Sequence, residues 1–163
     1  MDSADSRESL VALLAFIVLI VAAVFFIRWF HRAYRNLRPL EGSEPRFKTW
    51  WAIGGWFIPI WNLFRPKQIA NDLWRSSRAP GEPANYVPAL FQWWWAFFII
   101  STLIENASFR ADVSASDVDT YSTLAVVDMF TDSLNVVAGI LAILVVRRTT
   151  ARMDTRAAQT ASA

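Results

Sequence analysis

Three polar residues interrupt an otherwise apolar segment near the C-terminus: Asp128, Asp132 and Asn135. Their spacing of four and then three residues places them on one face of an α-helix. An ionisable residue at membrane depth is costly to insert and commonly marks a function. Two carboxylates one helical turn apart can share a proton, which raises the pKa of one of them. This face is therefore a candidate intramembrane polar site that relays protons or binds a cation.

The same face also fits a structural role between packed helices. Asp128 lies only about 6 Å along a helix from Leu124, which places its carboxylate near the outer membrane interface. Asp132 and Asn135 then hydrogen-bond polar groups on neighbouring helices. We favour this interpretation and keep proton or ion transport through Asp128 and Asp132 as the alternative. The candidate partners on neighbouring helices are Gln92, Ser101 and Thr102.

The composition predicts a membrane protein. Hydrophobic residues make up 55% of the 163 residues and the mean hydropathy is +0.28, which is too apolar for a soluble domain of this length. The length fits a single membrane domain over residues 1–163. The net charge is only +2 and the arginines cluster beside apolar segments, which argues against nucleic-acid binding. The absence of cysteine excludes disulfides, thiol catalysis and cysteine-bound metals.

Three apolar segments can cross a bilayer as helices, which takes about 20 residues each. They cover residues 10–30, 88–104 and 124–146, and the expected fold class is an all-α integral membrane protein. We expect an exposed acidic loop over 109–123, with Ser116 as the N-cap of the last helix. The tail over 155–163 is rich in Ala, Thr and Ser and is expected to be disordered.

The segment over 50–64 is apolar but short and interrupted. As a continuous helix it would cover only about 22 Å, less than a hydrocarbon core of about 30 Å. Gly54, Gly55 and Pro59 lie in its middle, where glycine weakens a helix and proline removes a hydrogen bond. Its tryptophans are typical of the membrane interface. We predict a Trp-rich re-entrant or interfacial helical hairpin, giving three spanning helices, and the alternative is a short fourth span.

Basic residues beside these segments predict a topology. If the hairpin does not cross the membrane, all Lys and Arg residues except Arg7 and Arg110 lie on one side. The positive-inside rule favours this arrangement, because a crossing hairpin would divide the charges almost evenly. We therefore expect a cell-membrane protein with its N-terminus outside and its C-terminus in the cytoplasm.

Some of these basic residues are placed to contact anionic lipid headgroups. Asn62 is expected to cap an amphipathic helix over 63–77 that lies in the membrane interface. Three arginines after the first span recur at helical spacing and form a stripe on one face. The expected partners are a bilayer with anionic headgroups, and a second copy of the chain or another membrane protein. The candidate headgroup contacts are Arg28, Arg32, Arg35, Arg65 and Lys67.

Two neighbouring stretches carry a recognisable motif. FIRWFHRAYRNLRPL is followed by RFKTWWAIGGWFIPIWNLFRPKQIANDLWRSS. These stretches resemble the signature of the bacterial membrane family called domain of unknown function 4328, with its RAYRNLR element and WAxGGWFIPIxNLxRPxQ core. The resemblance covers Phe26 to Ser77 and implies a multi-pass membrane protein without an established activity or catalytic residues. Lys67 stands where the family is expected to carry an aromatic residue.

The sequence contains no recognisable catalytic motif. HExxH, GxSxG and a phosphate-binding glycine-rich loop are absent. The single histidine, His31, is expected on the opposite side of the membrane from Asp128, so no nucleophile with a base in reach is predicted. We therefore expect no enzymatic activity, no cofactor and no metal. The expected function is an interaction or scaffold role in the cytoplasmic membrane.

Overall fold

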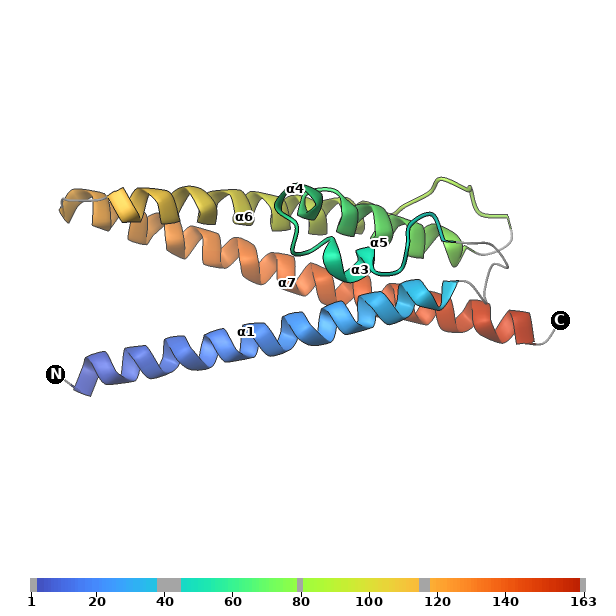
Figure 1. Cartoon of the computed structure of the whole chain (residues 1–163), viewed down its shortest axis with the longest axis horizontal. Helices are drawn as coiled ribbons and strands as arrows, with labels where there is room; N and C mark the ends of the chain where they lie inside the picture. Colours follow the sequence, from blue (N-terminus) through green and yellow to red (C-terminus); the bar gives the residue numbers. More distant parts are fainter. Residues whose placement is uncertain (1–2, 38–44, 79–80, 115–117, 162–163) are drawn as a thin grey trace. The chain divides into compact units, whose positions relative to one another are not determined.

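The computed structural model describes residues 3–37, 45–78, 81–114 and 118–161 (Figure 1). All regular elements in these ranges are α-helices, which confirms the expected all-α class. The chain divides into an N-terminal unit, Met1–Pro66, and a C-terminal unit, Lys67–Ala163. The helices are α1 (Ser3–Arg35), α3 (Trp51–Gly54), α4 (Pro59–Asn62), α5 (Arg65–Ser76), α6 (Ala89–Ser114) and α7 (Val118–Ala161).

α1 is the long helix of the N-terminal unit. Its 33 residues contain neither glycine nor proline and extend about 50 Å. Every side chain from Leu10 to Phe25 is exposed, so this part of the helix has no packed face. The last turns differ, because Phe30, Tyr34 and Leu37 are buried.

The segment over 50–64 is not one continuous helix. α3 and α4 comprise four residues each and are separated by residues 55–58. Ile58 is extended, with φ −93° and ψ 115°, because the following Pro59 disfavours the helical conformation at the residue before it. The interruption therefore lies where the glycine and proline positions predict it.

Aromatic contacts hold residues 50–64, referred to below as the hairpin, against the end of α1. Trp56, between α3 and α4, meets Phe26 and Phe30 edge-on, at centroid distances of 5.5 and 5.9 Å. The backbone N–H of Phe47 donates to the hydroxyl of Tyr34 at 2.9 Å. Each edge-to-face pair contributes about 0.5–1.5 kcal/mol beyond its buried area. Packing in this unit is thus concentrated at one end of α1.

The start of α5 differs from the expectation. α5 begins at Arg65, and Asn62, the predicted N-cap, is instead the last residue of α4. The N–H of Asn62 donates to the C=O of Ile58 at 2.8 Å, so its backbone belongs to the preceding turn. Pro66 lies in the first turn of α5, where its missing N–H costs no hydrogen bond.

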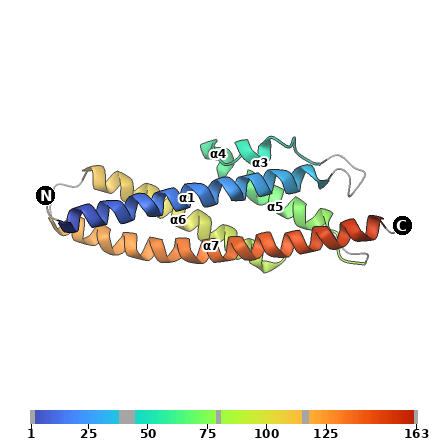
Figure 2. The ribbon, with the colours of Figure 1, turned by 90° about the horizontal axis from the view of Figure 1, so that it is seen from below.

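α6 and α7 of the C-terminal unit lie side by side and run antiparallel (Figures 1 and 2). Their buried residues recur at spacings of three, four and seven, which builds a seam along one side of each helix, as in coiled-coil packing. Small and polar side chains in the seam let the two backbones approach closely. The seam includes Phe91, Trp94 and Ser101 on α6, and Thr131, Ala138 and Val145 on α7.

The acidic loop predicted over 109–123 is wrong for most of its length. α6 continues to Ser114 and α7 begins at Val118. The predicted N-cap, Ser116, lies outside the described residues. The helical conformation continues here because α6 and α7 are already formed by their packing, and adding a turn to an existing helix costs little free energy.

The disordered tail predicted over 155–163 is also wrong as far as the described residues extend. α7 continues to Ala161 and comprises 44 residues. Ala, Arg, Gln and Met have high helix propensities, so they prolong a helix that packing has already formed. The low hydrophobicity of the tail indicates solvent exposure and not the loss of helix.

Two helices are long and apolar enough to cross a membrane, by length and composition. They are Ser9–Arg35, which contains the segment expected to span over 10–30, and Ala125–Ala161, which contains all but the first residue of the segment expected over 124–146. α6 has 26 residues, enough for about 39 Å, but its second half carries several charged side chains. The fold therefore provides two candidate membrane-spanning helices.

Candidate functional site

Arg65, the first residue of α5, lies within three aromatic rings of the N-terminal unit. Its guanidinium carbon is 4.2 Å from the ring centroid of Phe47, 4.4 Å from that of Trp61 and 5.0 Å from that of Trp51. Each such cation–π contact contributes about 0.5–2 kcal/mol, depending on how far it is shielded from water. A Cβ at Gly55 would lie 3.0 Å from the Cβ of Arg65, so this approach requires glycine. Arg65, which was predicted to contact lipid headgroups, therefore lies among the aromatic rings of α3, α4 and the residues before them.

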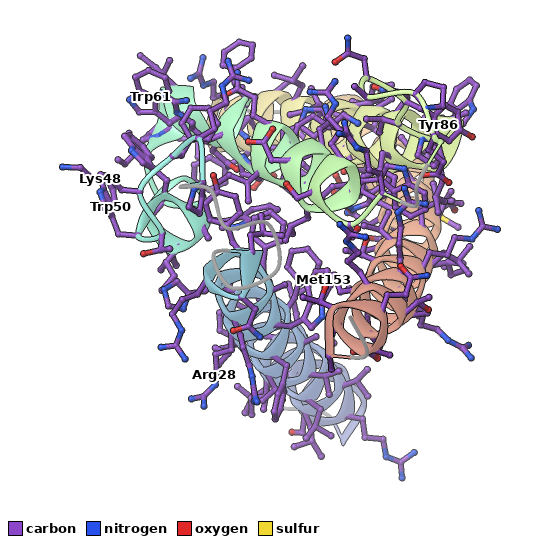
Figure 3. All side chains as sticks on the ribbon, turned by 90° about the vertical axis from the view of Figure 1, so that its right-hand side faces the viewer. Arg28, Lys48, Trp50, Trp61, Tyr86 and Met153 are labelled. Carbon is purple, nitrogen blue, oxygen red and sulfur yellow. The ribbon has the colours of Figure 1, made fainter. Side chains whose placement is uncertain are left out.

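The outer surface of the hairpin is apolar and exposed. Phe57 and Ile60 each leave 72% of their surface uncovered. Trp50, Trp61 and Lys48 project outward at the edge of the N-terminal unit (Figure 3). An exposed surface with large apolar and aromatic side chains marks a contact with a membrane or another protein.

The predicted arginine stripe lies on α1. Arg28, Arg32 and Arg35 are all exposed, and Arg28 points away from the helix (Figure 3). The stripe begins where the apolar part of α1 ends. Each basic residue near an anionic membrane surface contributes about 1 kcal/mol of attraction. Their contact with lipid headgroups stays a prediction.

The three predicted polar residues lie along α7, and one of them reaches α6. Nδ2 of Asn135 donates a hydrogen bond to Oε1 of Glu105. Asp128, Asp132 and Asn135 are exposed. The contact between Asn135 and Glu105 joins α7 to α6, and the two aspartates lie on the exposed side of α7.

The partners predicted for this face are not the ones found. The hydroxyls of Ser101 and Thr102 both donate to the C=O of Phe98 on their own helix, at 3.1 and 2.7 Å, and Gln92 is exposed. Glu105 was not predicted as a partner of Asn135, because Glu105 directly follows the apolar segment and was expected to lie past the end of the helix. Its position four residues after Ser101 is the signal that places it on the seam side.

A second group of polar side chains connects α5, α6 and α7 in the C-terminal unit. Nζ of Lys67 lies 5.7 Å from the ring centroid of Phe91, and the ring of Trp74 meets Phe91 edge-on at 5.3 Å. The guanidinium carbon of Arg152 lies 4.3 Å from the Trp74 ring centroid. Arg152 also donates to both carboxylate oxygens of Glu82, in the connection before α6.

Lys67 is partly buried in this group. Burial, together with a smaller effect of repulsion from Arg75, lowers the pKa of Lys67 from 10.5 to about 8. Its Nζ is shielded from water and has no hydrogen-bond partner among the described residues. Shielding an ammonium without an acceptor is unfavourable. Lys67, which was predicted to contact lipid headgroups at the surface, thus lies partly buried over the ring of Phe91.

These features define an all-helical protein with two helices long and apolar enough to cross a membrane. Residues 1–151 match the family described as Domain of unknown function (DUF4328), and the chain belongs to this family. The match confirms the family expected from the RAYRNLR and WAIGGWFIPIWNLFRPKQ motifs. No curated protein and no solved structure matches the chain. Within the described ranges, no group of three or more His, Cys, Asp or Glu side chains is arranged to hold a metal ion.

Proposed function

We propose that this chain is a non-enzymatic multi-pass protein of the cytoplasmic membrane with an interaction or scaffold role. In this arrangement α1, α6 and α7 cross the bilayer. The α3–α4 hairpin enters the cytoplasmic leaflet and returns to the side from which it came. The N-terminus is outside and the C-terminus is in the cytoplasm.

The observation that carries the proposal is the exposed apolar part of α1. Its side chains from Leu10 to Phe25 are all uncovered, and Leu, Ile, Val and Phe each favour an apolar environment by about 1.5–3 kcal/mol. Water is an unsuitable solvent for such a surface, whereas lipid chains match it. In the hairpin, α3 and α4 have four residues each and therefore extend only about 6 Å, too little to cross a bilayer.

The distribution of basic residues supports the same topology. The arginine stripe of α1, the basic residues of α5 and the arginines after Val146 then share the cytoplasmic side. α5 fits a position at the membrane interface with its charged side toward the headgroups, because Ile69, Ala70 and Leu73 pack inside the protein while its charged residues are partly exposed.

Reporter fusions test the path of the hairpin. A reporter at Gly42 and another at Gly81 are expected in the same compartment, the cytoplasm. A third reporter at Ser116 is expected on the outside, because α6 crosses. Opposite compartments for Gly42 and Gly81 would show that the hairpin crosses, and the same compartment for Gly81 and Ser116 would show that α6 does not.

The interaction role rests on the open face of α7. Asp128 and Asp132 are exposed beside an apolar helix surface, and carboxylates within a membrane generally face a partner or a water-filled space. A covering protein, either a second copy or another membrane protein, supplies such surroundings. Native mass measurement of the chain extracted with its partners tests this, and a bare monomer would contradict it.

Proton- or ion-coupled transport is the second candidate. The contact of Glu105 with Asn135 supports it, because it brings a further carboxylate to the face that carries Asp132. Asp132→Asn in reconstituted vesicles separates the two functions. A loss of proton or cation flux with normal folding supports transport, whereas an absence of flux in the wild-type chain removes this candidate.

A further inference from the structure

The C-terminal unit contains buried hydrogen-bond donors that lack an acceptor within the described part of the chain. We refer to the five residues that carry them as the donor cluster. Each atom is shielded from water, and a buried donor without a partner costs about 1–3 kcal/mol. The donor atoms are Nζ of Lys67, Nε1 of Trp74, Nε of Arg75, Oγ1 of Thr149 and Nε of Arg152.

Ring contacts and positions along the helices connect these residues. Lys67 and Trp74 share the ring of Phe91, and Trp74 in turn contacts Arg152. Arg75 lies about two turns after Lys67 on α5, near enough for their charges to repel. Thr149 lies three residues before Arg152 on α7, on its buried side. Ring contacts therefore join Lys67, Trp74 and Arg152, and Arg75 and Thr149 neighbour them along their own helices.

The donor cluster and the carboxylates beside it carry a net positive charge. Arg152 donates to both carboxylate oxygens of Glu82, which neutralises that cation. Asp72, three residues before Arg75 on α5, offsets one of the charges of Lys67 and Arg75, so one positive charge is left over. A partly buried cation is more stable beside an anion.

We propose that the donor cluster binds a phosphate group, supplied by the headgroup of an anionic phospholipid. A phosphate offers several strong acceptor oxygens, which suits an ammonium, a guanidinium and a hydroxyl on two helices of the same unit. The amide of Asn71, between Lys67 and Arg75 on the same side of α5, has an unpartnered Oδ1 and can present its NH2 group after a flip. The rings of Phe91 and Trp74 provide an apolar wall for the glycerol part. The assignment of the phosphate to a lipid headgroup rests on the proposed function, in which α5 lies at the membrane interface. The assignment of a phosphate group as the ligand does not depend on that position.

Binding by the full chain in a neutral detergent tests the site. Phosphatidylglycerol is titrated against diacylglycerol, a neutral lipid that lacks the phosphate group, and inorganic phosphate is titrated in a separate arm. Lys67→Gln and Arg75→Gln are each expected to weaken phosphatidylglycerol binding at least tenfold, because charge-assisted hydrogen bonds contribute about 1.5–3 kcal/mol. The matched control is Arg148→Gln, which removes the same charge from an exposed position of α7 and is expected to change the Kd less than twofold.

The outcomes separate the sources of phosphate. Phosphatidylglycerol binding that depends on Lys67 and Arg75 and is not displaced by inorganic phosphate supports the lipid headgroup. Binding of inorganic phosphate with the same dependence supports the site and overturns the lipid source. Equal losses in Arg75→Gln and Arg148→Gln, or equal binding of both lipids, overturn the site itself.

A folding control keeps the test valid. Each variant is compared with the wild-type chain by circular dichroism and by elution volume. Arg75→Lys, which keeps the charge but loses the planar fork, serves where Lys67→Gln does not fold, and it is expected to weaken binding by less than Arg75→Gln. The result is also independent of the reporter experiment, because inorganic phosphate binding in detergent does not depend on whether the hairpin crosses a membrane.

Discussion

α1 and α7 are both long apolar helices, but they obtain their stability from different surroundings. From Leu10 to Phe25, α1 buries no side chain. Over a comparable apolar stretch, α7 buries Thr131, Ala138 and Val145 against α6. Both helices meet the same length and composition criteria for crossing a membrane. Hydropathy therefore identifies a helix that suits lipid, whereas the spacing of small and polar residues identifies the one that also packs against a neighbour.

Truncating a buried ring should distinguish the packed C-terminal unit from α1 most strongly. Phe91→Ala removes a fully buried ring of α6, in contact with Trp74 of α5, and is expected to lower the free energy of unfolding by about 3–5 kcal/mol. The matched change in α1, Phe16→Ala, affects a side chain that is 60% exposed and is expected to cost less than about 0.5 kcal/mol. Unfolding in detergent, followed by circular dichroism, measures both. Equal losses would mean that α1 is packed in the native protein.

Two adjacent positions of α7 sharpen the comparison within one helix. Ala138→Leu places extra carbon atoms in the seam and is expected to destabilise the pair by about 1–3 kcal/mol. Gly139→Leu should be nearly neutral, since a Cβ there has no neighbour within 4 Å. The same unfolding measurement applies. A larger loss at Gly139 would indicate that a partner covers the open face of α7.

The hairpin of the N-terminal unit depends on one cation in place of a seam. Arg65→Met removes contacts with three aromatic rings and is expected to cost about 1–2 kcal/mol. Arg35→Met is the control, because Arg35 is exposed on α1. Protease cleavage within residues 50–64 should become faster only in the Arg65 variant. Equal cleavage rates would show that the aromatic rings hold the hairpin without the guanidinium.

The smallest expected effect concerns pH. The pKa of Lys67 is about 8 in the folded chain against 10.5 as the ordinary value, so the unfolded chain binds more protons between these values. The contribution of Lys67 to the free energy of unfolding therefore rises as the pH increases from about 8 to 10.5. Below pH 8 the charged amine destabilises the fold by about 1 kcal/mol, after allowance for its partial exposure.

Lys67→Met removes this pH dependence. The variant should be more stable than the wild type at pH 7, and the difference should shrink as the pH approaches 10.5. Thermal unfolding at both pH values measures it. Lys48→Met is the control because Lys48 is exposed, and the same trend in that variant would exclude Lys67 as the cause.

The elements that depend on local chemistry were accessible from the sequence. The uninterrupted apolar run defines α1, and Pro59 with its preceding residue defines the gap between α3 and α4. The amphipathic pattern locates α5 to within two residues of each end. In each case the signal lies in neighbouring residues, so no knowledge of tertiary packing is needed.

The candidate sites depend on residues that are distant in sequence, and this limited their prediction. The rings around Arg65 come from Phe47 before α3, from Trp51 in α3 and from Trp61 in α4. Glu105 and Asn135 are 30 residues apart, and their contact follows from the register of α6 against α7. The tail was predicted as disordered because its composition is polar, whereas helix propensity and a long packed helix before it decide its conformation.

The length of α7 has a consequence for whatever assembles at its C-terminal end. From Val146 to Ala161 the helix continues for about 22 Å past the end of its apolar segment. A factor docked on the final turns is thereby held at this distance from the apolar segment by a rigid spacer. The distance is fixed by helical rise, and deleting four residues shortens it by about 6 Å and rotates the attached factor by about 40°.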